Sequence, residues 1–282
     1  MTGYSNIFDR LRGRLKGGQW GDLRQRFGWG VLLLILGFAM VAVAGIWLQL
    51  GVALICGLMM WELVRLTSWR HPEFHPSHHP ILIAILSGLV MFTMLAVPGD
   101  WPMLLVLVPI LIGLGGTHRH QRMAYASFTA AILWAGYSLV VLREIRGLPT
   151  ILWIVATVVQ SDVLGYFVGR KIGGRKFWPS ISPKKTWSGT LAGWVGALVL
   201  AAILMLSGWS GPGVLLVGPL LAIAGQFGDI AESWLKRRVD AKDSSELIPG
   251  HGGVLDRFDA MAGALLLALV LALLHLLPQI GD

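Results

Sequence analysis

Charged residues are scarce in this chain: Asp, Glu, Lys and Arg make up only 13% of its 282 residues. With hydrophobic residues at 55% and a mean hydropathy of +0.68, the composition excludes an ordinary soluble domain. We predict an all-α polytopic membrane protein with about nine transmembrane helices of roughly 17–23 residues each. The apolar runs behind this prediction are 30–48, 50–66, 81–97, 101–116, 123–142, 150–168, 189–207, 213–235 and 259–277.

Cysteine is almost absent as well. Cys56 is the single cysteine and lies within an apolar run, so an intrachain disulfide is excluded. The basic N-terminus lacks a short apolar core followed by a cleavage site, so we expect no removed signal peptide. The sequence also has no internal repeat, no low-complexity segment and no basic soluble domain. We therefore expect a membrane protein that binds no nucleic acid.

Lysine and arginine are distributed unevenly along the chain. All of them except Arg143 and Arg146 fall in the N-terminal tail or in loops near 65–80, 117–122, 169–188 and 236–258. Because cytoplasmic segments of membrane proteins are enriched in Lys and Arg, we predict a cytoplasmic N-terminus and a C-terminus on the opposite side. The expected location is the inner (cytoplasmic) membrane of the cell, with several spans.

Before residue 145 the apolar runs contain few charged residues, whereas after it polar residues enter the runs and the loops predicted to be cytoplasmic lengthen. We therefore divide the sequence into a basic cytoplasmic tail (1–28), N-terminal transmembrane helices (29–145) and a catalytic transmembrane part with cytoplasmic loops (146–282). A formal net charge of +8 suits an anionic membrane surface and anionic substrates.

The run that ends in "QFGDIAESWLKRR" carries two acidic residues near the end of a predicted membrane helix. Asp229 and Glu232 are three residues apart, and Lys236 follows Glu232 by four, so the three share one helix face. Charged groups at such a depth are costly and are usually functional. The structural alternative is an ion pair between Glu232 and Lys236, with Asp229 paired elsewhere.

The next stretch, "IPGHGGVLDRFDAM", places glycines around His251 and carboxylates at the start of an apolar run. Gly252 and Gly253 allow a backbone to approach a ligand closely, and a helix N-terminus can bind phosphate oxygens. The alternative is a plain turn in which Asp256 or Asp259 caps the helix. The spacing of a Walker loop is missing.

Together these stretches predict a metal and phosphate site. Hard oxygen ligands without cysteine favour magnesium, as one or two ions. Carboxylates that hold metal beside cations that neutralise phosphate are typical of phosphoryl or nucleotidyl transfer. The predicted metal ligands are Asp229, Glu232, Asp256 and Asp259, and the surrounding cations are Lys236, Arg237, Arg238, Lys242 and Arg257.

A third polar stretch covers residues 160–189. Asp162 lies about two turns inside a predicted helix with Tyr166 four residues on, and Gly165 and Gly169 form a GxxxG face for close helix approach. A loop then leads to Ser182, Pro183, Lys184, Lys185 and Thr186. This loop could clamp a polyphosphate or a lipid phosphate, or it could be a solvated loop that only sets topology.

The stretch 233–259 resembles the signature of the phosphatidate cytidylyltransferase (CDP-diacylglycerol synthase) family. The match runs through Ser233, Lys236, Arg237, Lys242, Asp243, Pro249, His251, Gly252, Gly253, Asp256, Arg257 and Asp259. Residues 162–189 are similar to two further family elements, through Asp162, Tyr166, Gly169, Ser182, Pro183, Lys184 or Lys185, Thr186 and Gly189. Trp61-Glu62 is similar to another. The sequence departs from the family pattern at Gly165, in place of alanine, and at Ser188, in place of glutamate.

The resemblance implies magnesium-dependent transfer of a cytidylyl group from CTP to phosphatidic acid, which forms CDP-diacylglycerol and pyrophosphate in phospholipid biosynthesis. It implies an active site at the cytoplasmic interface and admits a homodimer. The implied catalytic residues are Asp229, Asp256, Lys236, Lys242, Asp243 and His251. The implied substrate-binding residues are Asp162, Tyr166, Ser182, Lys184, Lys185, Thr186, Arg237, Gly252, Gly253 and Arg257.

Other functions remain open at this point. A different lipid nucleotidyltransferase or phosphotransferase would need the same charges. A cation-coupled transporter would use Asp162 and Asp229 to bind its ion, although the sequence has no inverted repeat.

Overall fold

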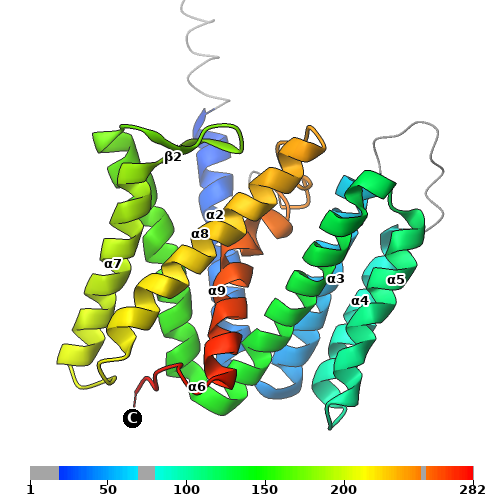
Figure 1. The fold of residues 1–282 in the computed structure, drawn as a ribbon, viewed down its shortest axis with the longest axis horizontal. Coiled ribbons are helices and arrows are strands. Elements are labelled where there is room, and N and C mark those ends of the chain that lie inside the picture. Colours follow the sequence, from blue (N-terminus) through cyan, green and yellow to red (C-terminus); the bar gives the residue numbers. More distant parts are fainter. Residues whose placement is uncertain (1–18, 69–79, 249–251, 282) are drawn as a thin grey trace, which may run out of the picture.

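The computed structural model describes residues 19–68, 80–248 and 252–281. Helices dominate these residues, and a small hairpin covers one end of the bundle (Figure 1). The helices are α2 (Gln19–Val43), α3 (Gly45–Ser68), α4 (Pro80–Ala96), α5 (Leu107–Gly116), α6 (Arg122–Ile172), α7 (Trp187–Leu206), α8 (Val214–Arg238) and α9 (Leu255–Leu273), with short 3-10 turns at Trp101–Val106 and Arg119–Gln121.

The membrane class predicted from composition is confirmed. Within the described residues, four helical segments are long and apolar enough to cross a membrane, namely Gly45–Ser68, Arg119–Ile172, Trp187–Leu206 and Val214–Arg238. Pro80–Ala96 and Trp101–Gly116 are shorter apolar helices. The count of nine spans and the orientation of the termini stay predictions.

The two predicted helices 123–142 and 150–168 are both present within α6, where they meet at a kink. Gly147 has a φ of +81°, a value outside the helical region, and Pro149 follows it within α6. Proline lacks the N–H group that would continue the helical ladder, and glycine tolerates the positive φ. The helix is therefore interrupted at Gly147, at the predicted boundary, and a second helix follows directly.

A hairpin connects α6 to α7 and is the exception to the all-α prediction. Strand β1 (Lys176–Trp178) pairs antiparallel with β2 (Ser182–Thr186), with Lys176 opposite Thr186. The hairpin packs on α6, α7 and α8. It lies toward the same end of the bundle as the C-terminal end of α8 (Figure 1).

Glycines allow the helices of the second half to pack closely. A Cβ atom on Gly189 of α7 would lie 2.3 Å from the carbonyl oxygen of Gly165 on α6, which confirms the predicted close approach at the GxxxG face. A Cβ atom on Gly228 of α8 would lie 2.3 Å from the carbonyl oxygen of Asp259 on α9. The second contact brings the Asp229 region of α8 against Asp259.

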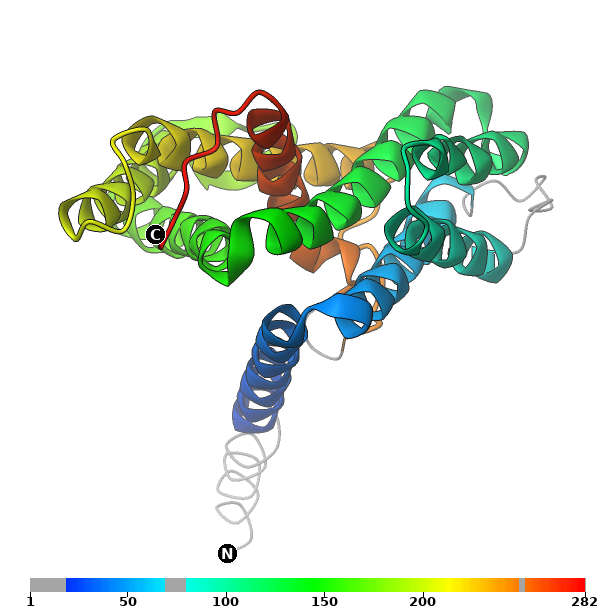
Figure 2. The same ribbon diagram turned by 90° about the horizontal axis from the view of Figure 1, so that it is seen from below.

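Helix α2 projects away from the rest of the bundle (Figure 2). Its C-terminal end is held by Arg143 of α6, whose Nε donates to the carbonyl oxygen of Val41 at 2.8 Å. Arg143 is one of the two arginines that the sequence places outside the cytoplasmic segments, so this contact gives it a structural role.

Candidate active site

A pocket of about 610 Å³ opens beneath the hairpin, between α6, α7 and α8. Seven residues predicted to bind substrate or metal line it: Asp162, Tyr166, Ser182, Lys184, Lys185, Thr186 and Asp229. The hairpin folds back over the helix ends and so brings its lysines to the carboxylates of α6 and α8. The volume is within the range of small-molecule binding sites.

Lys185 and Asp229 form the central contact of this pocket. The Lys185 ammonium lies 2.6 Å from Oδ2 of Asp229 and also donates to the backbone carbonyl of Gln226 at 3.5 Å. The Oδ1 atom of Asp229 accepts a hydrogen bond from Ser233 Oγ at 3.5 Å. The charge of Asp229 also acts on Asp162 and on Asp259. The Lys185 ammonium thus binds Asp229, and its charge also acts on Asp162.

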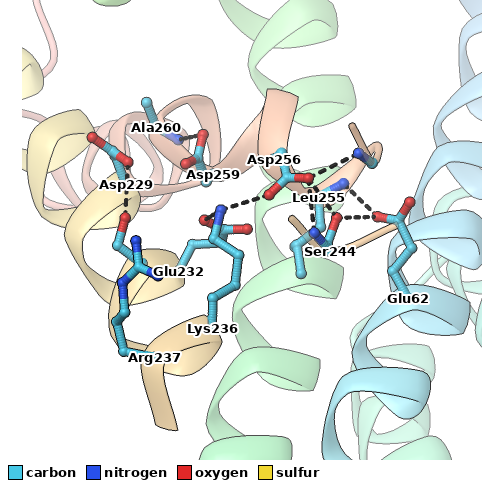
Figure 3. Close-up of polar contacts among 12 residues, drawn as sticks. Glu62, Asp229, Glu232, Lys236, Arg237, Ser244, Leu255, Asp256, Asp259 and Ala260 are labelled. Carbon is cyan, nitrogen blue, oxygen red and sulfur yellow. Dashed lines mark hydrogen bonds and ion pairs between the residues drawn. The ribbon is translucent and has the colours of Figure 1, made fainter. Parts of the chain in front are cut away.

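A second group of charges lies deeper between α8 and α9 (Figure 3). The Lys236 ammonium is 2.5 Å from Oε2 of Glu232 and 2.6 Å from Oδ1 of Asp256. The side chains of Glu232 and Asp256 are only 1% and 6% exposed. The ion pair that the sequence left as a structural alternative is therefore present, and Asp229 is paired elsewhere, with Lys185.

Asp256 organises the turn that precedes α9. Its Oδ2 atom accepts hydrogen bonds from Ser244 N, Ser244 Oγ and Gly253 N, at 2.9, 2.9 and 2.8 Å. Burial alone would raise the pKa of the Asp256 carboxyl, but its hydrogen bonds with Lys236 and with the backbone N–H groups of Gly253 and Ser244 hold that pKa below its usual range. This carboxyl precedes the apolar part of α9 and is ionised at neutral pH.

The two described glycines of the turn, Gly252 and Gly253, are required because neighbouring side chains fill the space that a Cβ atom would need. Gly252 has a φ of +83°, and a Cβ atom there would lie 2.9 Å from Oδ2 of Asp256. A Cβ atom on Gly253 would lie 1.9 Å from Ser244 Oγ and 2.5 Å from Glu62 Oε1. The protein's own side chains thus lie close to both glycines, and their contact with a ligand stays a prediction.

Glu62 of α3 belongs to this group, although the sequence offered only the Trp61-Glu62 pair as a signal. Glu62 is 0% exposed. Its carboxylate accepts hydrogen bonds from the hydroxyls of Ser244 and Ser245 and from the backbone N–H groups of Val254 and Leu255. The N-terminal half of the protein thus reaches the signature stretch 233–259.

Gln226 is a second residue that the sequence did not single out. Its Nε2 atom donates to Ser161 Oγ at 3.1 Å, and its Oε1 atom accepts from Trp194 Nε1 at 2.9 Å. The side chain therefore joins α6, α7 and α8, and it lines the pocket beside Asp229. A glutamine within an apolar run was the available sequence signal.

The remaining predicted residues lie around these two groups. Arg237 Nε donates to the carbonyl of Ile181 and so ties the hairpin turn to α8. Thr186 caps α7 by accepting a hydrogen bond from Gly189 N at 3.3 Å. Lys242, Asp243 and Arg257 are exposed residues of the same loop and helix start. His251 lies outside the described residues.

The donor set fits magnesium by its chemistry. No three His, Cys, Asp or Glu side chains in the described part of the chain are gathered as a ready metal cage. Magnesium is usually held by one or two carboxylates together with substrate phosphates. Asp229 and Asp259 lie close together on neighbouring helices (Figure 3) and would be such a pair of carboxylates.

Comparisons with known proteins identify the family of the chain. Residues 24–276 match the sequence model of the cytidylyltransferase family. The chain is 43% identical over 145 residues to a Brucella abortus protein named phosphatidate cytidylyltransferase. The match covers 48% of this chain and 53% of that relative. The chain thus spans about half the length of the Brucella relatives that it matches.

Relatives of the same name match more of the chain. A Bacillus subtilis protein is 31% identical over 264 residues, covering 85% of this chain and 93% of its own. A Helicobacter pylori (strain J99) protein is 34% identical over 220 residues, and the match covers 76% of this chain and 73% of that relative. Because the family match takes in α3 and both groups of charged residues, the chain belongs to the cytidylyltransferase family.

Proposed function

We propose that the protein transfers the cytidylyl group of CTP to phosphatidate, giving CDP-diacylglycerol and pyrophosphate. The observation that carries the proposal is the pocket beneath the hairpin, where Lys184 and Lys185 meet Asp162 and Asp229. Cations suited to phosphate oxygens thus lie beside carboxylates suited to a divalent ion. The shared name of the relatives supports the choice of nucleotide and lipid.

The reaction needs little acid–base catalysis by the protein. An oxygen of the phosphatidate phosphate, already anionic, attacks the α-phosphorus of CTP and forms the new P–O bond. The bond from that phosphorus to the oxygen bridging to the β-phosphate breaks, and pyrophosphate leaves with the electron pair. The difficulty is bringing two polyanions together, which the lysines of the hairpin ease by neutralising phosphate charge.

Magnesium is part of the proposal. Asp229 and Asp259 would hold it, and it would supply charge neutralisation at the phosphates. Glu232 and Asp256, the other predicted ligands, are paired with Lys236. They would become ligands only if Lys236 turned toward a phosphate. Asp162 stands across the pocket, where its charge and that of Asp229 act on each other.

We further propose the inner membrane as the location, with the pocket on the cytoplasmic side. The lysines and arginines of 169–188 and 236–258 support this orientation, since such residues are enriched in cytoplasmic loops. CTP then reaches the pocket from the cytosol, while phosphatidate presents its phosphate at the membrane interface. A homodimer is compatible with this arrangement.

The test is product formation by the purified protein in lipid vesicles that contain phosphatidate. CTP, ATP, GTP and UTP are supplied separately, with and without magnesium, and diacylglycerol replaces phosphatidate in a parallel series. The proposal expects a CDP-lipid only with CTP, phosphatidate and magnesium. Transfer of phosphate to diacylglycerol, or no lipid product from folded protein, would overturn it.

A further inference from the structure

Glu62 is a buried carboxylate whose position the proposed chemistry does not yet use. It lies on α3, far in sequence from the charged stretches of the second half, and is 0% exposed. A buried ionised group is costly unless its oxygens are fully hydrogen-bonded. Its surroundings therefore show what the carboxylate is there to hold.

Each oxygen of Glu62 accepts one hydroxyl and one backbone N–H group. Oε1 accepts from Ser245 Oγ at 2.5 Å and from Val254 N at 2.9 Å. Oε2 accepts from Ser244 Oγ at 3.1 Å and from Leu255 N at 2.7 Å. All four donors belong to the loop and helix start that surround Asp256.

The backbone groups in this set lie at the N-terminal end of α9. Val254 precedes the helix and Leu255 is its first residue, where N–H groups have no partner within the helix. A negative charge at this position is favoured by the helix dipole. Glu62 thus fixes where α9 begins, and Asp256 is the second residue of that helix.

Ser244 connects Glu62 directly to Asp256. Its hydroxyl lies 3.1 Å from Glu62 Oε2 and 2.9 Å from Asp256 Oδ2, and its backbone N–H also donates to Asp256. Asp256 in turn binds Lys236 at 2.6 Å. A continuous chain of contacts therefore runs from α3 through the turn to the charged residues of α8 (Figure 3).

We propose that Glu62 is a positioning residue for the transfer reaction: it holds the start of α9 so that Asp256 and Lys236 keep their geometry. The inference rests on the proposed function, because it assumes that this pair acts on phosphate or metal. Glu62 lies outside the lining of the pocket beneath the hairpin and acts through Asp256. The N-terminal half therefore completes the site.

Glu62→Gln tests the proposal with almost no change in size. Glutamine has one oxygen and one NH₂ group, and either orientation turns the NH₂ toward a backbone N–H of Val254 or Leu255. We expect kcat to fall about 10- to 100-fold, as is typical when a residue that orients a ligand is changed, with KM for phosphatidate within about twofold. Thr67→Val, which removes a buried hydroxyl that donates to the carbonyls of Leu63 and Val64 on its own helix, should keep the wild-type kcat.

Two measurements separate positioning from general stability. In the Asp256→Asn background, Glu62→Gln should lower kcat no further, because groups that act as one unit are not additive. Ser244→Ala should lower kcat at least about fivefold more than Ser245→Ala, since both hydroxyls bind Glu62 but only Ser244 contacts Asp256.

Additive losses in the double variant, equal effects of the two serine variants, or a wild-type kcat for Glu62→Gln would each overturn the positioning role. The serine pair gives an answer even where Glu62→Gln fails to fold. An inactive wild-type protein would instead contradict the proposed function itself, so the two failures are distinct.

Discussion

The Lys185 ammonium lies 2.6 Å from Oδ2 of Asp229, and this ion pair joins the hairpin to α8 across 44 residues of sequence. It places a predicted phosphate clamp and a predicted metal ligand in one pocket. Because both side chains are partly exposed, at 18% and 34%, the pair contributes little to stability. Lys185 is therefore well placed to exchange its carboxylate partner for a substrate phosphate.

Lys185→Gln should raise KM for CTP about tenfold, the equivalent of roughly 1.4 kcal/mol. The neutral side chain loses a charge-assisted hydrogen bond to phosphate, which is worth more than a neutral one. Initial rates at varied CTP measure the change. Lys171→Gln, at an exposed position on the last turn of α6, is the matched control and should behave as the wild type.

Asp229→Asn should lower kcat on the order of 10²-fold or more while the protein still inserts and folds. Asparagine keeps the size of the side chain and removes the negative charge that would hold magnesium. Activity is followed by formation of the CDP-lipid at saturating magnesium. Asp100→Asn provides the comparison, since Asp100 is exposed and makes no side-chain cap bond. Near-normal turnover of Asp229→Asn would remove this residue from the site.

Lys236→Met should destabilise the protein by about 3–5 kcal/mol, because it leaves the buried carboxylates of Glu232 and Asp256 without their cation. Thermal unfolding in detergent, with the wild type run alongside, measures the loss. Lys171→Met, at the exposed site on α6, should change stability by no more than about 0.5 kcal/mol. An unchanged melting temperature for Lys236→Met would show that Lys236, Glu232 and Asp256 do not form a stabilising unit.

Ser188→Glu restores the residue that the family pattern leads us to expect. Ser188 Oγ donates to the carbonyl of Gly173 at 2.5 Å and lies 3.1 Å from Thr186 Oγ1. It also borders an open hollow lined by Arg175 and Lys176, which leaves room for a longer acidic side chain. We expect activity to be retained and the magnesium needed for half-maximal rate to fall. Loss of activity at normal expression would mean that residues 182–189 are arranged differently from those of the relatives.

Short-range contacts of the site could be predicted from the sequence. The pairing of Glu232 with Lys236 follows from helical spacing, and the bend of α6 falls where Gly147 and Pro149 occur. The hairpin was missed because Lys176–Trp178 and Ser182–Thr186 lack the alternation of apolar and polar residues that marks a strand.

Long-range contacts could not be predicted in this way. The hydrogen bond from Leu255 N to Glu62 joins residues 193 positions apart in the sequence. No local sequence pattern predicts a contact between residues so far apart. The need for glycine at 253 had the same origin, since the space for its Cβ is filled by Ser244 and Glu62. The sequence located the charged residues, and tertiary packing decided which of them meet.

The most direct test of the central claim follows the two ends of the CTP triphosphate separately. Wild-type protein in phosphatidate vesicles is given CTP labelled at the α-phosphorus in one reaction and at the γ-phosphorus in another. The account predicts that the α-label enters the lipid and the γ-label leaves as pyrophosphate, and that Asp229→Asn slows both on the order of 10²-fold or more. Entry of the γ-label into lipid, or equal release of both labels without a lipid product, would contradict cytidylyl transfer.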